Sequence, residues 1–263
     1  MPMVQGNDKQ ISYVTGRGGI RKGFRTLVFV HGSGGTRLHW NYQRQFFEQS
    51  HNVVIVDLPG HGEAGKDGED SVGAYGRDLL DLLRTLPGDL FCLIGHSLGG
   101  AIVQEFTLIY PQYVEALILV GTGARLRVLP EILEGIQERF EETVRLICDY
   151  AFSKRTPVDL IQKGVEAMLK TRPTVLRGDF AACNRFDIMD RVGNIQVPTL
   201  VVCGSDDLLT PPKYAHFLAE KIEGARLETI DGAGHMVMIE KPDEFNTRVM
   251  EFLQTLSERT MTS

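Results

Sequence analysis

Short apolar runs alternate along this chain with longer segments in which apolar residues recur at every third or fourth position. Most of the short runs are rich in Val, Ile and Leu and have no polar face, which is typical of parallel strands buried on both sides. They span residues 27–30, 53–56, 90–94, 116–120, 199–203 and 227–230. Strands separated by helices predict an α/β fold with a mostly parallel, doubly wound sheet.

The helical pattern is clearest behind Ser71, a residue type that often caps the N-terminus of a helix. Apolar residues then recur on one face over 72–86. Similar patterns predict helices over 40–49 and 98–110, and a last helix that begins near Pro242. Each of these helices follows a predicted strand, so the alternation of strand and helix covers most of the chain.

The alternation stops between Thr122 and Val197, where the pattern is helical throughout. Three segments follow one another there: one from Pro130 through Ile132, Ile136, Phe140, Val144 and Ile147, one from Thr156-Pro157, and one from Arg172-Pro173 through Phe180. Proline is well suited to the first turn of a helix. The pattern predicts a helical cap, residues 123–196, inserted between two consecutive strands of a core formed by residues 1–122 and 197–263.

The composition is that of one large globular domain. The 263 residues are 43% hydrophobic and 24% charged, and the net charge is −6. The acidic balance argues against nucleic acid as the main partner. The N-terminus lacks the basic and apolar regions of a signal peptide, and the longest run without a charge, residues 90–104, is too short to cross a bilayer. We therefore expect neither nucleic acid nor a membrane as partner, while the oligomeric state stays open.

The four cysteines have no CxxC spacing and lie in apolar surroundings. Cysteines of this kind are typical of buried free thiols in a reducing compartment. We therefore expect a cytoplasmic protein.

The segment Gly95-His96-Ser97-Leu98-Gly99 stands between a predicted strand and a predicted helix. A G-x-S-x-G sequence at this junction is typical of a nucleophile elbow, a sharp turn that exposes the serine hydroxyl at the carboxyl end of the sheet. The glycines are needed because a Cβ would collide with neighbouring backbone in so tight a turn. The N–H groups at the start of the helix would face a developing oxyanion. The alternative is a glycine-rich turn with an idle serine.

A serine nucleophile needs a base and a group that orients the base. His235 follows Asp231-Gly232-Ala233-Gly234 behind the last predicted strand, and an acid is available in Gly204-Ser205-Asp206-Asp207 behind the strand before it. The order Ser, Asp, His agrees with an elbow on this fold. The other histidines are interpreted as local scaffold (His31 and His96) or as surface and packing residues (His39, His51, His61 and His216).

Together these residues resemble the α/β-hydrolase superfamily. The resemblance rests on four motifs in order: His31-Gly32-Ser33-Gly34-Gly35 (the glycine loop), the elbow, Gly204-x-x-Asp207-x-x-x-Pro211, and Gly232-Ala233-Gly234-His235 with Glu240 and Pro242. It covers the chain from about Ile11 and is weakest across the cap.

The resemblance implies Ser97 as nucleophile, His235 as base and Asp207 as the acid that orients it, rather than Asp206. It also implies an oxyanion hole formed by the backbone N–H groups of Ser33 and Leu98, and a helical lid that covers the pocket and selects the substrate. No cofactor is implied, and no set of residues has the spacing of metal ligands.

Within the superfamily, Ser97 is unlike haloalkane dehalogenases and epoxide hydrolases, which carry an aspartate at the elbow. The glycine loop is similar to that of C–C hydrolases acting on ring-cleavage products, but those usually carry an aromatic residue where this chain has Met236. Residues 179–199 are similar to enol-lactone hydrolases and carboxylesterases. We therefore expect a serine hydrolase that cleaves carboxylic esters or lactones of small to medium, largely apolar substrates through an acyl-enzyme. A C–C hydrolase and a ligand-binding receptor with slow turnover are the alternatives.

Several further side chains are candidates for the substrate pocket. Those expected to face it from the cap are Ile132, Ile136, Phe140 and Met168, although Phe140 could equally belong to the core of the cap. Three others have two interpretations each: Arg125 and Arg127 could bind a substrate carboxylate or form a solvated edge, and Trp40 could line the pocket or pack against a helix.

Overall fold

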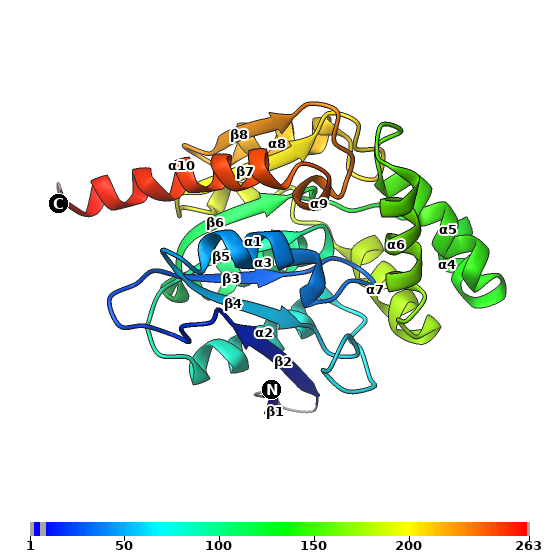
Figure 1. Ribbon diagram of the computed structural model, residues 1–263, viewed down its shortest axis with the longest axis horizontal. Coiled ribbons are helices and arrows are strands. Elements are labelled where there is room, and N and C mark those ends of the chain that lie inside the picture. The colour runs from blue at the N-terminus through cyan, green and yellow to red at the C-terminus, as the bar shows by residue number, and fades with distance from the viewer. Residues whose placement is uncertain (1–2, 6–8, 262–263) are drawn as a thin grey trace.

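The computed structural model describes residues 3–5 and 9–261, and eight strands in this part of the chain form one sheet (Figure 1). Their order is β1-β2-β4-β3-β5-β6-β7-β8, and the strands from β4 onward in that order run parallel, while β1 and β2 are antiparallel to their neighbours. The bounds are β1 Met3–Gln5, β2 Gln10–Thr15, β3 Thr26–Val30, β4 Asn52–Asp57, β5 Phe91–His96, β6 Val114–Val120, β7 Thr199–Gly204 and β8 Arg226–Ile230. The mostly parallel sheet predicted from the sequence is confirmed.

The sequence pattern did not reveal β1 and β2. In β2 only Ile11 and Ser12 are buried, and polar residues fill half of the strand. An antiparallel strand with one partly exposed face lacks the continuous apolar run that marks the parallel strands.

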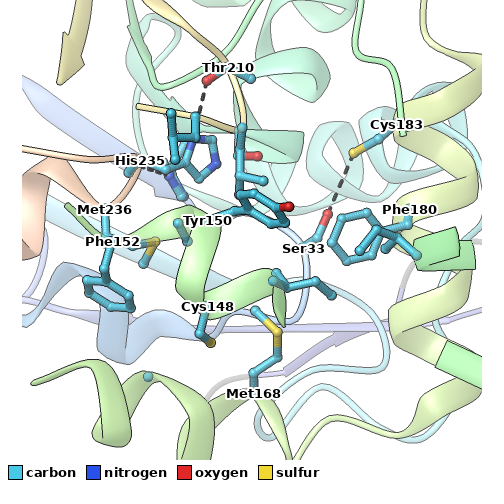
Figure 2. A pocket seen from close by; sticks show the side chains of 18 of the residues that line it. Ser33, Cys148, Tyr150, Phe152, Met168, Phe180, Cys183, Thr210, His235 and Met236 are labelled. Atoms are coloured by element: carbon cyan, nitrogen blue, oxygen red, sulfur yellow. Dashed lines mark hydrogen bonds between the residues drawn. The ribbon is translucent and has the colours of Figure 1, made fainter. Parts of the chain in front are cut away.

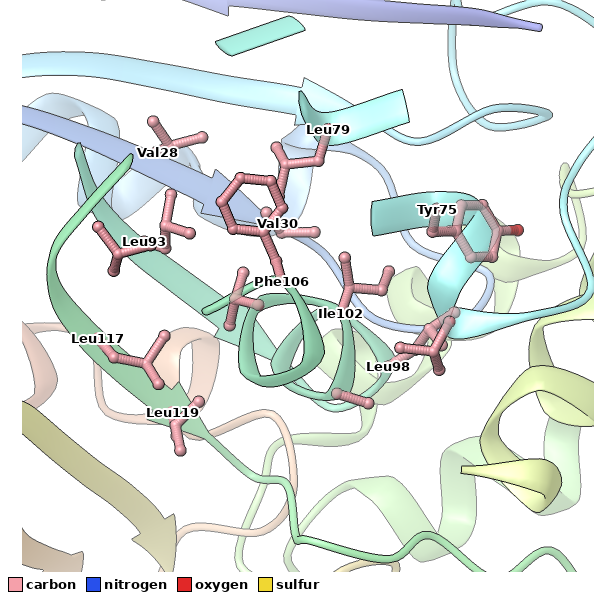
Figure 3. Close-up of a cluster of buried hydrophobic side chains, with 14 of the residues drawn as sticks. Val28, Val30, Tyr75, Leu79, Leu93, Leu98, Ile102, Phe106, Leu117 and Leu119 are labelled. Carbon is pink, nitrogen blue, oxygen red and sulfur yellow. The ribbon is translucent and has the colours of Figure 1, made fainter. Parts of the chain in front are cut away.

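Helices cover both faces of the sheet. On one face lie α2 (Val72–Thr85), α3 (Leu98–Ile109) and α8 (Pro212–Lys221), and on the other α1 (Asn41–Phe47) and α10 (Pro242–Met261). Alternate strand residues point to the two faces, so that Val28 and Val30 join one hydrophobic cluster and Leu27 and Phe29 the other. Figure 3 shows side chains of α3 packed against the strands in the first cluster. The doubly wound arrangement is therefore confirmed.

The predicted cap is present as four helices between β6 and β7, which are neighbours in the sheet. Figure 1 shows them grouped beyond one end of the strands. Their bounds are α4 Pro130–Glu138, α5 Phe140–Ala151, α6 Val158–Met168 and α7 Pro173–Arg185; the shorter elements of the chain are η1 Arg37–Trp40, η2 Pro111–Tyr113, η3 Val192–Asn194 and α9 Val237–Glu240. The insertion between consecutive strands is confirmed, whereas the exact domain borders at 122/123 and 196/197 stay a prediction.

The first cap helix differs from its prediction. The apolar residues from Ile132 to Ile147 lie on two helices, because Arg139 leaves the helical region with φ −142° and ψ 57°. The two helices then pack closely, and a Cβ on Gly135 would collide with the Thr143 hydroxyl. The periodicity continues across the break because both helices bury residues in one cluster, so spacing alone could not reveal the bend.

A buried carboxylate on α2 predicts how stability depends on pH. Asp78 is 6% exposed, and its Oδ2 has no hydrogen-bond partner among the described residues. Burial, together with the nearby Glu69 charge, raises the pKa of Asp78 to about 7. Since an unfolded aspartate loses its proton near pH ~4, the folded protein binds more protons between about pH 4 and 7, and its stability falls as pH rises through that window.

Asp78→Asn is therefore expected to raise the melting temperature at pH 8 and to have little effect at pH 4, because the amide carries no charge to bury. Thermal unfolding of both proteins across this range measures the effect. Asp81→Asn on the same helix, where the carboxylate is less buried and lies near Arg84, is the matched control. A gain that is equal at both pH values would contradict the assignment.

Candidate active site

The turn between β5 and α3 holds Ser97 in a strained backbone conformation. Its φ is 53° and its ψ −115°, and within the described ranges it is the single non-glycine residue with positive φ. Three hydrogen bonds surround its peptide groups: Ser97 N–H donates to the Val120 carbonyl, and the Ser97 carbonyl accepts from Thr122 Oγ1 and from the Ala101 N–H. Strain that the surrounding structure maintains in this way is typical of functional sites.

The positions on both sides of Ser97, Gly95 and Gly99, have no room for a Cβ atom. A Cβ on Gly95 would collide with the Gly99 carbonyl, and a Cβ on Gly99 would collide with the carbonyls of Val30 and His31. The turn therefore passes directly against the end of β3, where the glycine loop begins. This contact brings the elbow and the glycine loop together.

His235 and Asp207 lie in direct contact. Asp207 Oδ2 is 2.9 Å from His235 Nδ1, and both side chains are buried. The same carboxylate accepts from the N–H groups of Leu209 and Thr210 and from the Thr210 hydroxyl, which itself lies 3.2 Å from His235 Nδ1. An acceptor at Nδ1 fixes the ring tautomer and leaves Nε2 for other partners.

Asp206, the neighbouring acid, points elsewhere. Its carboxylate accepts from the Ser153 hydroxyl at 2.6 Å and from the Ser205 hydroxyl at 2.9 Å. These hydrogen bonds hold the pKa of Asp206 below its usual value. Asp206 thus joins the core to the segment that follows α5, and Asp207 is the acid that meets His235.

The backbone N–H groups of Ser33, in the glycine loop, and of Leu98, at the elbow, are candidates for the oxyanion hole. Neither the Ser33 N–H nor the Leu98 N–H takes part in a hydrogen bond of the described residues. Leu98 is the first residue of α3, so its N–H belongs to the unpaired group at a helix N-terminus, which favours negative charge. Both residues predicted for the oxyanion hole therefore carry a free donor.

A cavity of about 570 Å³ lies between the core and the cap, and Ser33, Ser97 and His235 line it. Its volume is that of a typical small-molecule site. Figure 2 shows His235 beside Thr210 and Ser33 beside Cys183, with Phe152, Met168 and Phe180 around the space between them. The described hydrogen bonds include none between Ser97 and His235. Catalytic hydrogen bonds of this kind are often long without ligand and shorten when substrate binds.

The cap residues predicted to face the cavity divide into two groups. Ile132 and Met168 line it, whereas Ile136 and Phe140 do not and pack into a hydrophobic cluster instead. For Ile136 the expectation of a pocket position is thus wrong, whereas for Phe140 the alternative interpretation, the core of the cap, agrees with its contacts. The bend at Arg139 explains the difference for Phe140, which begins a separate helix.

Contacts distinguish the two interpretations for Trp40 and Arg125, but not for Arg127. Trp40 is fully buried against Phe29, Phe245 and His96 and does not line the cavity. Arg125 pairs with Asp187 at 2.6 Å. Arg127 reaches the cavity edge but also pairs with Asp187, at 3.5 Å. Arg125 therefore forms part of a solvated edge and Trp40 is a packing residue, whereas both interpretations stay open for Arg127, which lines the cavity.

Other histidines support the shape of the site. His96 Nε2 donates to the His235 carbonyl at 3.1 Å, and His31 Nε2 accepts from the Leu58 N–H at 3.0 Å. Burial, followed by the neighbouring His235 charge, holds the pKa of His96 well below its ordinary value. His61 is not at the surface: it is fully enclosed and contacts Asp179.

Sequence reasoning missed the roles of Thr210, Glu240 and Asp179. Glu240 accepts from the N–H groups of Ser153 and Gly234 and so ties the segment after α5 to the loop that carries His235. For Glu240 the sequence does carry a signal, because this residue belongs to the motif around His235. Thr210 lies inside the motif that ends at Pro211 and bonds to the nearby Asp207, but its contact with His235, like all the contacts of Asp179, joins residues distant in sequence.

Across residues 3–5 and 9–261, no group of three or more His, Cys, Asp or Glu side chains could hold a metal ion. In the same ranges no helix combines the length and the apolar character needed to span a bilayer. The expectations that the chemistry needs no metal and no cofactor stay predictions.

A protein-family model described as the alpha/beta hydrolase family matches residues 27–248 of this chain. Among curated proteins, one of Rhizobium rhizogenes (strain K84 / ATCC BAA-868) named "Putative carbamate hydrolase RutD" is 32% identical over 89% of this chain and 94% of its own length. A 2-hydroxy-6-oxo-6-phenylhexa-2,4-dienoate hydrolase of Comamonas testosteroni is 28% identical over 87% of each chain.

Solved structures resemble the whole chain. A thermophilic esterase has 35% sequence identity and a TM-score of 0.83, with 97% of each chain covered. Est816, described as an N-acyl homoserine lactone degrading enzyme, has 27% identity and a TM-score of 0.85, with 95% of this chain and all of the other covered. The cap and the core are thus both included in the similarity.

Proposed function

Because the chain belongs to the alpha/beta hydrolase family, we propose that it is a serine hydrolase that cleaves carboxylic esters or lactones of small to medium, largely apolar substrates. The observation that carries the proposal is the strained Ser97 at a cavity shared with His235, whose Nδ1 is held by Asp207. The esterase and the lactone-degrading enzyme among the similar structures support the ester and lactone class.

In the proposed mechanism, Ser97 Oγ attacks the substrate carbonyl carbon while His235 Nε2 takes the hydroxyl proton. Asp207 accepts from Nδ1–H and stabilises the imidazolium that forms. The N–H groups of Ser33 and Leu98 stabilise the oxyanion of the tetrahedral intermediate. His235 then gives its proton to the leaving alkoxide, which departs as alcohol and leaves an acyl-enzyme ester on Ser97.

Water completes the cycle. His235 removes a proton from water as the oxygen attacks the acyl-enzyme carbonyl, and a second tetrahedral intermediate forms in the same oxyanion hole. Its collapse returns the proton to Ser97 Oγ and releases the carboxylic acid. All groups in this scheme belong to the protein, so it requires no metal or cofactor.

The cavity supports an apolar substrate of limited size. Its wall consists mainly of aliphatic and aromatic side chains from the cap and the core; its charged residues are Arg127, Lys163 and Lys213, with no Asp or Glu. An apolar wall around a few polar groups removes water from the reacting centre and strengthens the oxyanion contacts.

A panel of substrates tests the proposal on one preparation: p-nitrophenyl esters of increasing acyl length, a lactone, a thioester, a carbamate and a vinylogous diketone. We expect turnover of esters or lactones to exceed that of the others. Dominant cleavage of the diketone would favour the C–C hydrolase alternative, which the similarity to the dienoate hydrolase keeps open. Strong thermal stabilisation by a ligand without turnover would favour a receptor.

Met168 is expected to select for acyl chain length, because its side chain lines the cavity from the end of α6. Met168→Ala should raise the kcat/KM ratio of an eight-carbon to a four-carbon ester about four- to tenfold, since each methylene that enters apolar surroundings contributes about 0.8 kcal/mol. Phe140→Ala, on the same cap but outside the cavity, should leave the ratio within about twofold. Equal shifts in both variants would mean that Met168 acts on cap stability instead.

We also propose a cytoplasmic location. All four cysteines are buried and free, as expected where thiols stay reduced. Fractionation of the source cells with an antibody against the chain tests this.

A further inference from the structure

A carboxylate of the cap is buried against three separate segments of the core. Asp179, on α7, is fully buried, and its Oδ2 accepts from the Gly34 N–H at 2.9 Å and lies 2.9 Å from His61 Nε2. Its Oδ1 accepts from the Tyr75 hydroxyl at 2.6 Å. The three partners follow β3, follow β4 and lie on α2, so one cap side chain holds together elements that are distant in sequence.

The charge of this carboxylate is compensated by His61. The two ring nitrogens of His61 face acceptors only, with Nδ1 3.0 Å from the Pro59 carbonyl and Nε2 beside Asp179. When Asp179 is ionised, a ring between these two acceptors carries a proton on each nitrogen, and the pair is then an imidazolium and a carboxylate. Burial by itself lowers the pKa of His61, but the Asp179 charge and hydrogen bond raise it above its ordinary value. Buried charges that are paired and hydrogen-bonded are costly to disrupt.

The cap also contacts the other side of the Gly34 residue. Thr171, between α6 and α7, donates its hydroxyl to the Gly34 carbonyl at 3.2 Å. A Cβ on Gly34 would lie 2.6 Å from Leu176 Cδ1 and 3.0 Å from Met168 Cγ, and its φ is +63°. The cap therefore contacts Gly34 at its N–H, its carbonyl and its Cα. The positive φ and the lack of space for a Cβ both require glycine at this position.

We propose that Asp179 is a positioning residue, which holds the glycine loop from the cap so that the Ser33 N–H points at the oxyanion. The inference rests on the proposed function. Ser33 is the residue before Gly34, so the donor predicted for the oxyanion hole and the N–H bound by Asp179 belong to adjacent peptide groups. Fixing one peptide plane restricts the other, because only the two backbone dihedrals of Ser33 lie between them.

As a consequence, the oxyanion hole is complete only when the cap packs against the core and Asp179 binds the Gly34 N–H. A substrate that improves the packing of the cap would then also align the Ser33 N–H, and so contribute to the rate rather than only to binding. The effect of Asp179 should therefore fall on kcat and on ligands that carry an oxyanion.

The test compares three variants on an ester that the wild-type enzyme cleaves. Asp179→Ala removes the acceptor from Gly34, Asp179→Asn keeps one amide oxygen there, and Tyr75→Phe removes only the bond on the opposite carboxylate oxygen. Loss of one oxyanion donor costs about 10²–10³ in kcat, so misalignment of one in Asp179→Ala should cost about 10- to 100-fold. Asp179→Asn should recover part of this loss, and Tyr75→Phe should stay within about threefold of wild type.

A pair of inhibitors separates positioning from general damage. An alkyl trifluoromethyl ketone forms a tetrahedral adduct with an oxyanion, whereas the methyl ketone of the same chain length binds largely without one. Asp179→Ala should weaken the trifluoromethyl ketone by the same factor as kcat and leave KM and the methyl ketone within about threefold. If Asp179→Ala does not fold, Thr171→Val gives the same comparison, with an expected three- to tenfold loss in kcat and in trifluoromethyl ketone affinity.

The outcomes are distinct. A folded Asp179→Ala protein with kcat and trifluoromethyl ketone affinity within twofold of wild type overturns the positioning role, as does an equal loss for both ketones. If Thr171→Val is used instead, unchanged kcat and trifluoromethyl ketone affinity, or an equal loss for both ketones, likewise overturns the positioning role. A wild-type protein that neither cleaves an ester nor forms the ketone adduct contradicts the proposed function itself, and the inference with it.

Discussion

A Ser97→Ala variant is expected to lose covalent labelling by an organophosphonate fluorophore and to hydrolyse esters about 10⁵- to 10⁶-fold more slowly, the range seen when a serine hydrolase loses its nucleophile. The fold should persist, because alanine adds no atoms to a turn that already accommodates a Cβ at φ 53°. Labelling followed by gel fluorescence, with initial rates on the best ester of the panel, measures both effects.

Ser205→Ala is the matched control for this experiment. Ser205 also follows a strand at the same edge of the sheet, but its hydroxyl bonds to Asp206 and to the Gly232 N–H and does not line the cavity. The control should label like the wild type. Intact-mass and peptide data that place the adduct on Ser33 or Ser205 would overturn the assignment of the nucleophile.

Asp207→Asn is expected to lower kcat by about 10⁴, the cost typical of losing the carboxylate that orients a catalytic histidine. An amide at this position can face His235 Nδ1 with its NH₂ group, which stabilises the wrong tautomer of the ring. The side chain is 2% exposed and accepts from four donors, so water cannot replace the missing charge. Rates at constant pH, with circular dichroism to verify folding, measure the loss.

Asp206→Asn provides the comparison within the same turn. Asp206 binds the hydroxyls of Ser153 and Ser205 and is partly exposed, so its substitution should cost less than about tenfold. If Asp206→Asn were the more damaging of the two, the orienting acid would be Asp206, and the contact between Asp207 and His235 would have no catalytic meaning.

The strand and helix pattern of the core follows from the sequence because it depends on local periodicity. Buried parallel strands show as apolar runs, and helices that cover them show one apolar face. The elbow is equally local: a serine between two glycines at a strand end is determined by the space around a few consecutive residues. Motif order along the chain then identifies the family, and the choice of Asp207 over Asp206 agrees with the observed contact to His235.

Only the tertiary structure decided how the cap meets the core. The bend at Arg139 is invisible in a periodic pattern, and it turns Phe140 away from the cavity that Ile132 and Met168 line. The contacts of Asp179 join α7 to His61, Tyr75 and the glycine loop. No spacing along the sequence predicts these contacts. Their roles arise from packing between elements that are distant along the chain, where the partner of a buried charge is set by three-dimensional proximity and not by spacing.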